Sequence, residues 1–131
     1  MMTLASVVND VSSGESFPVA LGNFLDAFYL APDEATFRDE PVHVSVQIAR
    51  SLEMDAYLAA TAERLARLNK LNIPTWVYEP ERYLHVPSFG SDAAALRATL
   101  LLESPPEFRA RNIFVTGNVL TRASQHHGHA A

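Results

Sequence analysis

The sequence predicts an all-α protein, a small single-domain bundle of four to six helices, and three observations lead to this prediction. Apolar residues recur at helical spacing in several windows, most regularly from Met54 to Asn69. One segment, residues 72–90, holds three prolines and four aromatics and is expected to be irregular. A single stretch, residues 42–48, alternates like a strand, and it has no convincing partner. We expect one helical domain over 1–123 and a flexible, His-containing tail over 124–131.

The composition is that of an ordinary globular protein. The chain has 131 residues, of which 48% are hydrophobic and 19% charged, and this length buries roughly two-thirds of the unfolded surface. No apolar run approaches the ~20 residues needed to span a bilayer, and the N-terminus lacks the pattern of a secretory leader. The absence of cysteine excludes disulfides and thiolate chemistry. We therefore expect a cytoplasmic protein without membrane association.

The net charge of −5 is unevenly distributed along the chain. Residues 1–60 carry nine acids and two bases, whereas residues 61–131 carry six acids and eight bases. Phosphate binding relies on clustered Lys and Arg, so this balance argues against unaided binding of nucleic acid. An acidic half of this kind suits a basic protein partner.

The N-terminal half contains two predicted helices and a less regular stretch. Leu4, Val7, Val8 and Val11 predict a helix over residues 3–11. A second helix starts at Ser16 and ends near Tyr29, and its apolar stripe is expected to be core. Residues 33–40 form a helical turn or a solvated loop, and Pro41 ends it. Residues 42–48 are interpreted as an extended connector or the start of a helix, with His43 facing water.

The pattern from Met54 to Asn69 predicts the strongest helix. One face is apolar, and the opposite side carries good helix formers, several of them basic. Glu63 and Arg67 are four residues apart in the favourable order. The residues of the apolar face are Met54, Tyr57, Leu58, Thr61, Ala62, Leu65 and Leu68.

The C-terminal third is expected to turn a corner. Ser91 or Asp92 caps an apolar helix that ends before Ser104. The sequence Ser-Pro-Pro-Glu at 104–107 has the form of a capping box with proline at the first helical position. We expect the Ser104 hydroxyl to accept from an N–H of the first turn, and Glu107 to reach back to the Ser104 N–H. Phe108 should then point inward and Arg109 and Arg111 outward. Residues 113–115 are predicted to be buried, residues 116–118 to form a turn, and Val119 and Leu120 to dock on the core.

Aromatic and arginine side chains are the candidate binding residues. Aromatics in an irregular segment either pin it to the helices or form a contact face. Trp, Tyr and Arg dominate the binding energy of protein interfaces. The predicted partner-binding residues are Trp76, Tyr78, Tyr83, Phe89, Arg109 and Arg111.

The sequence contains no motif of a known catalytic site, and we predict no catalytic residue, metal site or cofactor. His126, His127 and His129 in the tail are expected to bind metal only adventitiously. One alternative is an enzyme: Arg122 and His127 resemble the Arg–His motif of HEPN-type ribonucleases, which are small helical bundles. That resemblance implies that the His acts as acid or base on an RNA phosphodiester.

Four segments carry a broader resemblance: FLDAFYLAP (24–32), DAYLAATAERLARLNKLNIPTW (55–76), RYLHVPSF (82–89) and LLLESPPEFRARNIFV (100–115). They resemble a family of short bacterial proteins encoded beside nucleotidyltransferase-like genes, in two-gene modules of the toxin–antitoxin type. The resemblance extends from Phe17 to Ala123. Similar segments also follow helix-turn-helix domains in antitoxin-like regulators, so a DNA-binding regulator is a second alternative, although no helix here has a basic recognition face.

The resemblance implies a non-enzymatic, protein-binding function. We expect an antitoxin-like or accessory member of such a module, which acts by occluding a surface of its partner. The implied partner is the nucleotidyltransferase-like product of the adjacent gene. Self-association into a homo-oligomer remains open.

Overall fold

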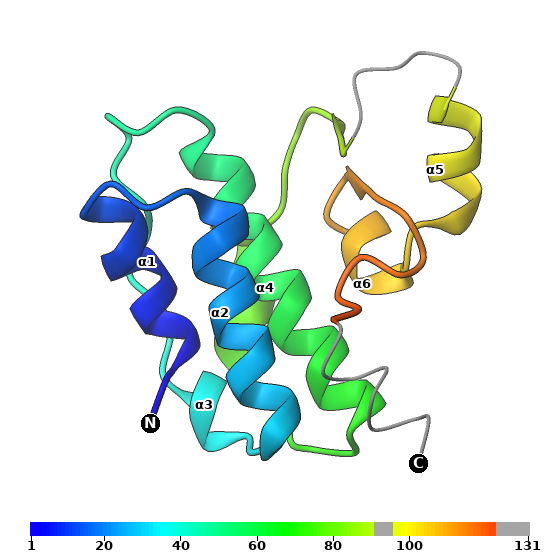
Figure 1. The fold of residues 1–131 in the computed structure, drawn as a ribbon. Helices are drawn as coiled ribbons and strands as arrows, with labels where there is room; N and C mark the ends of the chain where they lie inside the picture. Colours follow the sequence, from blue (N-terminus) through cyan, green and yellow to red (C-terminus); the bar gives the residue numbers. More distant parts are fainter. Residues whose placement is uncertain (91–95, 123–131) are drawn as a thin grey trace.

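Helix α4 (Ser51–Leu68) runs through the middle of the molecule, and the other elements pack around it (Figure 1). The structure is a computed structural model that describes residues 1–90 and 96–122. In these ranges it contains six α-helices, two short 3-10 helices and two strands of two residues each. The predicted all-α class is therefore confirmed.

The N-terminal helices α1 (Leu4–Ser12), α2 (Phe17–Leu30) and α3 (Ala35–Arg38) lie on one side of α4 (Figure 1). Ser16 caps α2, because its hydroxyl oxygen accepts a hydrogen bond from the Val19 N–H at 3.3 Å. The predicted apolar stripe on α2 lies in the core at Leu21, Phe24, Leu25 and Phe28, whereas its first residue, Phe17, is only partly buried. Residues 33–40 contain the single turn α3, whose Phe37 is fully buried.

The connection from α3 to α4 is an irregular coil. Of the alternating residues 42–48, only Val44 is buried, while Val42 and Val46 are exposed. The interpretation as a helix start is wrong, since α4 begins at Ser51 after Arg50 in a left-handed conformation (φ 62°).

The irregular segment 72–90 was correctly predicted and packs against α4. It contains the 3-10 helices η1 (Thr75–Tyr78) and η2 (Pro80–Arg82), both in contact with α4. The segment ends in strand β1 (Ser88–Phe89), which pairs in parallel with β2 (Ile113–Phe114). This pair was not predicted, because two-residue strands leave no alternation to detect.

The predicted corner is present, but the predicted capping box is wrong. Helix α5 (Arg97–Glu103) stops, the chain turns at Ser104, and α6 (Pro106–Arg109) follows. The Ser104 hydroxyl does not cap α6; it donates to the Ile113 carbonyl at 2.9 Å. Glu107 instead pairs with Arg64 on α4. Ser91 and Asp92, the predicted caps of α5, lie outside the described residues.

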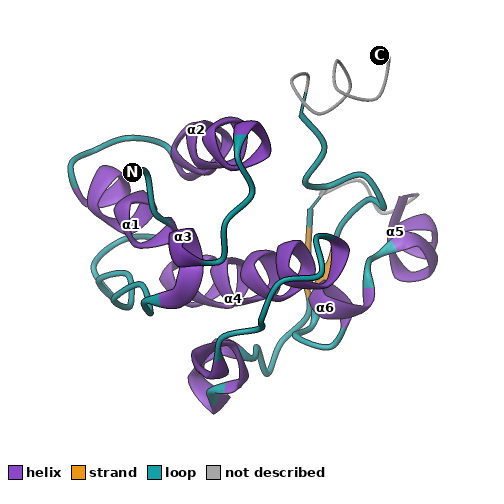
Figure 2. Cartoon of the chain, turned by 90° about the horizontal axis from the view of Figure 1, so that it is seen from below, coloured by secondary structure: helices purple, strands orange, loops and turns teal. Residues whose placement is uncertain are grey.

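Two expectations for α4 are wrong: one residue expected outside is buried, and one expected in the core is exposed. Glu63, on the side opposite the predicted apolar face, is buried, because η1, η2 and α6 cover that side. Leu68, expected in the core, is exposed at the C-terminal end of the helix. Figure 2 shows the molecule from below, with α4 across the middle, α2 above it and α6 beside its right-hand end.

The segment after β2 behaves as predicted. Residues 113–115 are buried, a turn follows at 116–118, and Leu120 docks on the core. The Tyr29 hydroxyl donates to the Leu120 carbonyl at 2.9 Å and so joins this segment to α2. The tail, residues 124–131, lies outside the described residues. Among the residues that are described, no helix is long and apolar enough to cross a membrane.

Candidate functional site

An apolar groove of about 760 Å³ opens between the N-terminal helices and the C-terminal third of the chain. Helices α2 and α4 form one wall, and α5, the β1–β2 pair and the turn after β2 form the other. Its apolar lining consists of Phe17, Pro18, Leu21, Met54, Tyr57, Phe89, Leu96, Leu100, Ile113, Val115 and Val119. We refer to this feature as the apolar groove. Its volume falls in the range of ordinary ligand sites.

Arg50, Glu53 and Ser88 form a small polar cluster in the lining of the groove. Arg50 Nη2 forms an ion pair with Glu53 Oε2 at 2.6 Å, and the Ser88 hydroxyl donates to the same oxygen. The hydrogen bond from Arg50, assisted by that from Ser88, outweighs burial and lowers the pKa of Glu53 below its ordinary value. Glu53 is therefore ionised at neutral pH and links α4 to β1.

Aromatic rings hold the groove in shape. Tyr57 packs edge-to-face on Phe17 (5.4 Å between centroids) and on Phe108 (4.9 Å). Burial raises the pKa of Tyr57 to about 12, so its hydroxyl stays protonated. On the other wall, Phe89 stacks on Phe114 at 5.2 Å. Such pairs contribute about 0.5–1.5 kcal/mol each beyond their buried area.

The six predicted partner-binding residues lie in three different settings. Tyr78 and Arg109 are exposed, Tyr83 and Phe89 are partly buried, and Trp76 and Arg111 are buried. Phe89 is the one of these six that lines the apolar groove. The expectation that Arg111 projects outward is therefore wrong, and Trp76 takes the packing role that was weighed for the aromatics.

Arg111 is the centre of a buried polar network. Its guanidinium donates to Glu63 Oε1 (2.8 Å), to the Glu107 carbonyl (2.8 Å) and to the Val77 carbonyl (2.7 Å). It also lies over the ring of Tyr83, 4.6 Å from the centroid. These contacts bind α6 and η1 to α4.

Glu63 receives three hydrogen bonds in this network. Arg67 (2.9 Å) and the Tyr78 hydroxyl (2.8 Å) donate to the carboxylate oxygen that Arg111 leaves free. Burial by itself raises the pKa of Glu63, but the bonds from Arg111, Arg67 and Tyr78 outweigh it and lower the pKa. The predicted Glu63–Arg67 pair is thus confirmed, and it belongs to a larger network.

Arg82 joins the connection between α3 and α4 to the rest of the fold, as Arg111 joins α6 and η1 to α4. It is fully buried and donates to the Pro41 carbonyl (2.6 Å), to the Asp55 carbonyl (3.1 Å) and to Glu40 (2.9 Å). Its guanidinium stacks over Trp76 at 4.8 Å, and the indole N–H donates to the Phe37 carbonyl. Trp76 and Arg82 are therefore structural.

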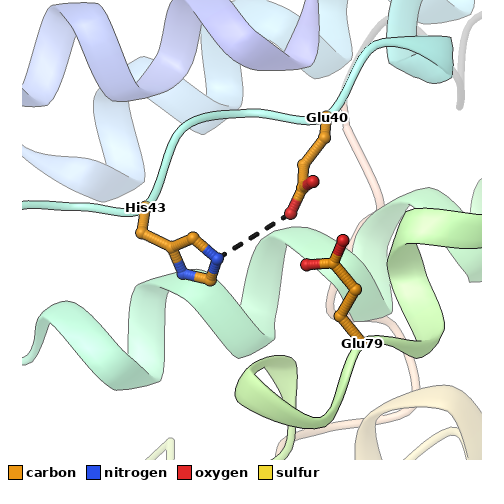
Figure 3. A group of neighbouring side chains, drawn as sticks. All are labelled: Glu40, His43 and Glu79. Carbon is orange, nitrogen blue, oxygen red and sulfur yellow. Dashed lines mark ion pairs between the residues drawn. The ribbon is translucent and has the colours of Figure 1, made fainter.

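Three potential metal ligands converge beside Arg82. One ligand atom from each of Glu40, His43 and Glu79 lies within 4.8 Å of the other two. Figure 3 shows the three side chains pointing toward one another, with Glu40 and His43 on one segment and Glu79 on another. His43 is exposed, as expected, and in addition its Nδ1 lies 3.0 Å from Oδ2 of the buried Asp55.

Arg122, the residue of the HEPN-type alternative, is engaged with α2. Its guanidinium pairs with both oxygens of Asp26, at 3.0 and 3.1 Å. A Cβ at Gly22 would lie 3.0 Å from the guanidinium nitrogens, so the glycine allows this close approach. His127 lies outside the described residues.

The sequence did not reveal the residues that build the groove or the polar networks. Groove residues come from separate segments whose apolar side chains looked like ordinary core. The burial of Arg82 and Glu63 could not be predicted from neighbouring residues, because charged residues are seldom fully buried. Comparison of the chain with protein-family models, with curated proteins and with solved structures gives no match.

Proposed function

We propose that this protein is a non-enzymatic binding protein that takes an apolar segment of a partner protein into the apolar groove. The observation that carries the proposal is the groove itself, a concave surface with an apolar lining and one charged cluster. Apolar surface of this kind is stabilised when a partner covers it.

Helix α5 extends the apolar surface beside the groove. Leu96, the residue just before α5, lines the groove and is half exposed, and Leu101 and Leu102 on α5 are also exposed. Aliphatic side chains along a groove rim suit an amphipathic helix of a partner, which binds through residues at helical spacing. Phe89 supplies a partly buried aromatic anchor in the same wall.

We infer the partner from the sequence resemblance alone. We take it to be the nucleotidyltransferase-like product of the adjacent gene, with this chain as the antitoxin-like or accessory member that occludes its surface. Groove binding differs from the contact face expected from the sequence, because Trp76 and Arg111 are buried. Tyr78, Tyr83 and Arg109 lie outside the groove lining.

The test is co-purification with the adjacent gene product, followed by calorimetric titration of two matched variants. Leu96→Glu places a charge in the groove and should weaken binding at least tenfold, which is about 1.4 kcal/mol. Leu30→Glu alters an exposed leucine outside the groove lining and should leave the affinity unchanged. Absence of a complex at micromolar concentration, or equal affinities for both variants, would overturn the proposal.

A further inference from the structure

We propose that Glu40, His43 and Glu79 form a binding site for one divalent transition-metal ion of the Zn²⁺ type, independent of the groove and of any protein partner. One imidazole nitrogen and two carboxylate oxygens are a donor set that Zn²⁺ accepts. Zn²⁺ bonds to such atoms are about 2.0–2.2 Å long, so neighbouring ligand atoms on one ion lie roughly 3.3 Å apart. The Nε2 of His43 and Oε2 of Glu40 already lie 3.8 Å apart.

The orientation of His43 supports the site. Its Nδ1 lies 3.0 Å from Asp55 Oδ2, and the other oxygen of that buried carboxylate accepts the Val44 N–H at 2.8 Å. With Nδ1 donating to Asp55, the lone pair of Nε2 faces Glu40 and Glu79 (Figure 3). A carboxylate behind a metal-ligating histidine is the usual arrangement that fixes its tautomer and raises its basicity.

The charges around the cluster also favour a cation. Glu40, Glu79 and Asp55 bring three negative charges and Arg82 brings one positive charge, which leaves −2 with His43 neutral. Arg82 is held by two backbone carbonyls and donates to Glu40, so it fixes Glu40 in place, while its positive charge offsets part of the negative charge of the cluster.

The segments that supply the ligands indicate what the metal does. Glu40 and His43 belong to the coil before α4, and Glu79 lies between η1 and η2. An ion bound by all three ties these two irregular segments together on the surface of α4. Because it binds the folded chain only, it raises the thermal midpoint of unfolding.

The experiment uses the full-length chain with His126, His127 and His129 changed to Ala, so that the tail cannot bind the metal. Titration with Zn²⁺ at neutral pH should show one ion per chain at micromolar or lower Kd, with a higher unfolding midpoint. His43→Ala and Glu79→Gln, placed separately in this background, should each weaken binding at least tenfold. His85→Ala, at an exposed histidine outside the cluster, should not.

Glu79→Gln keeps the test decisive if His43→Ala unfolds, because Glu79 is partly exposed and its change leaves the Asp55 contact intact. Mg²⁺ and Ca²⁺, which prefer all-oxygen sites, should stabilise the protein much less than Zn²⁺. The proposal fails if binding disappears with the tail histidines, if Glu79→Gln binds as tightly as the parent, or if Mg²⁺ is equally effective.

Discussion

Arg111 shows how one buried side chain determines the arrangement of its surroundings. It is fully buried, yet its Nη1 and Nη2 atoms make three hydrogen bonds and its plane stacks on Tyr83. Its Nε has no hydrogen-bond partner, as is also the case for Arg82. Two of its three acceptors are backbone carbonyls, so the residue replaces hydrogen bonds that regular secondary structure would otherwise supply.

Replacement of Arg111 should therefore lower the free energy of unfolding far more than replacement of Arg109, which lies on the same corner. We expect Arg111→Ala to lower the free energy of unfolding by about 3–5 kcal/mol, because it leaves the Glu63 charge buried with fewer donors. Arg109→Ala, at an exposed position, should change it by less than about 0.5 kcal/mol. Urea unfolding of the two variants measures both values. Similar stabilities would contradict the structural role of Arg111.

The sequence shows that two arginines lie on this corner, but it does not show that one of them is buried. Arg109 and Arg111 are two positions apart on a predicted helical turn, and both were expected outside. Helix α6 ends at Arg109, and the chain then curves back over α4. The direction of the Arg111 side chain depends on that curve, which local periodicity does not encode.

The corner between helices α5 and α6 is held by a different interaction of Ser104 from the expected helix cap. The proline pair ends α5 as predicted. The Ser104 side chain then bonds forward to the β2 segment, where it donates to Ile113 and accepts the Val115 N–H at 3.4 Å. A buried hydroxyl with two long-range partners holds the corner against β2, whereas a cap would have held only the first turn of α6.

Ser104→Ala tests this assignment. The substitution leaves the Ile113 carbonyl without its donor in a buried place, and we expect a loss of about 1–3 kcal/mol in the free energy of unfolding. Ser45→Ala is the matched control, because the Ser45 hydroxyl bonds only to the nearby Gln47 N–H at an exposed position. Thermal or urea unfolding reports both. An unchanged stability for Ser104→Ala would show that its long-range bonds contribute nothing.

Ion pairs also join segments of the molecule that lie far apart in the chain. Glu63 pairs with Arg111, Glu40 with Arg82, and Asp26 with Arg122. Each of these carboxyls has a lowered pKa, although burial opposes the shift, and Glu63 is the most buried of the three. A carboxyl with a lowered pKa in the folded state stabilises the fold above its unfolded pKa.

The stability that Glu63 contributes to the fold should depend on pH. The contribution of Glu63 is fully present above its unfolded pKa of about 4.3, and it is lost as the pH falls through the lower pKa of the folded state. We expect Glu63→Gln to be less stable than the parent at pH 7 and to lose less stability between neutral and acid pH. Asp26→Asn, at an exposed pair, should follow the parent closely. The free energy of unfolding, measured at several pH values in this range, gives the comparison. An equal pH dependence for Glu63→Gln and the parent would contradict the assignment.

Local sequence patterns predicted the helical class, the approximate spans of α1 and α2, α4 apart from its first turn, the irregular character of 72–90 and the corner after α5. These features follow from local spacing, capping residues and prolines, which act within a few residues. The covering of α4 became visible only in the folded structure. The same holds for the burial of Arg82 and Arg111, for the groove and for the Glu40–His43–Glu79 cluster. Each of these features depends on side chains that folding brings together from distant segments. Whether a charged residue is buried depends on the partners that it meets there.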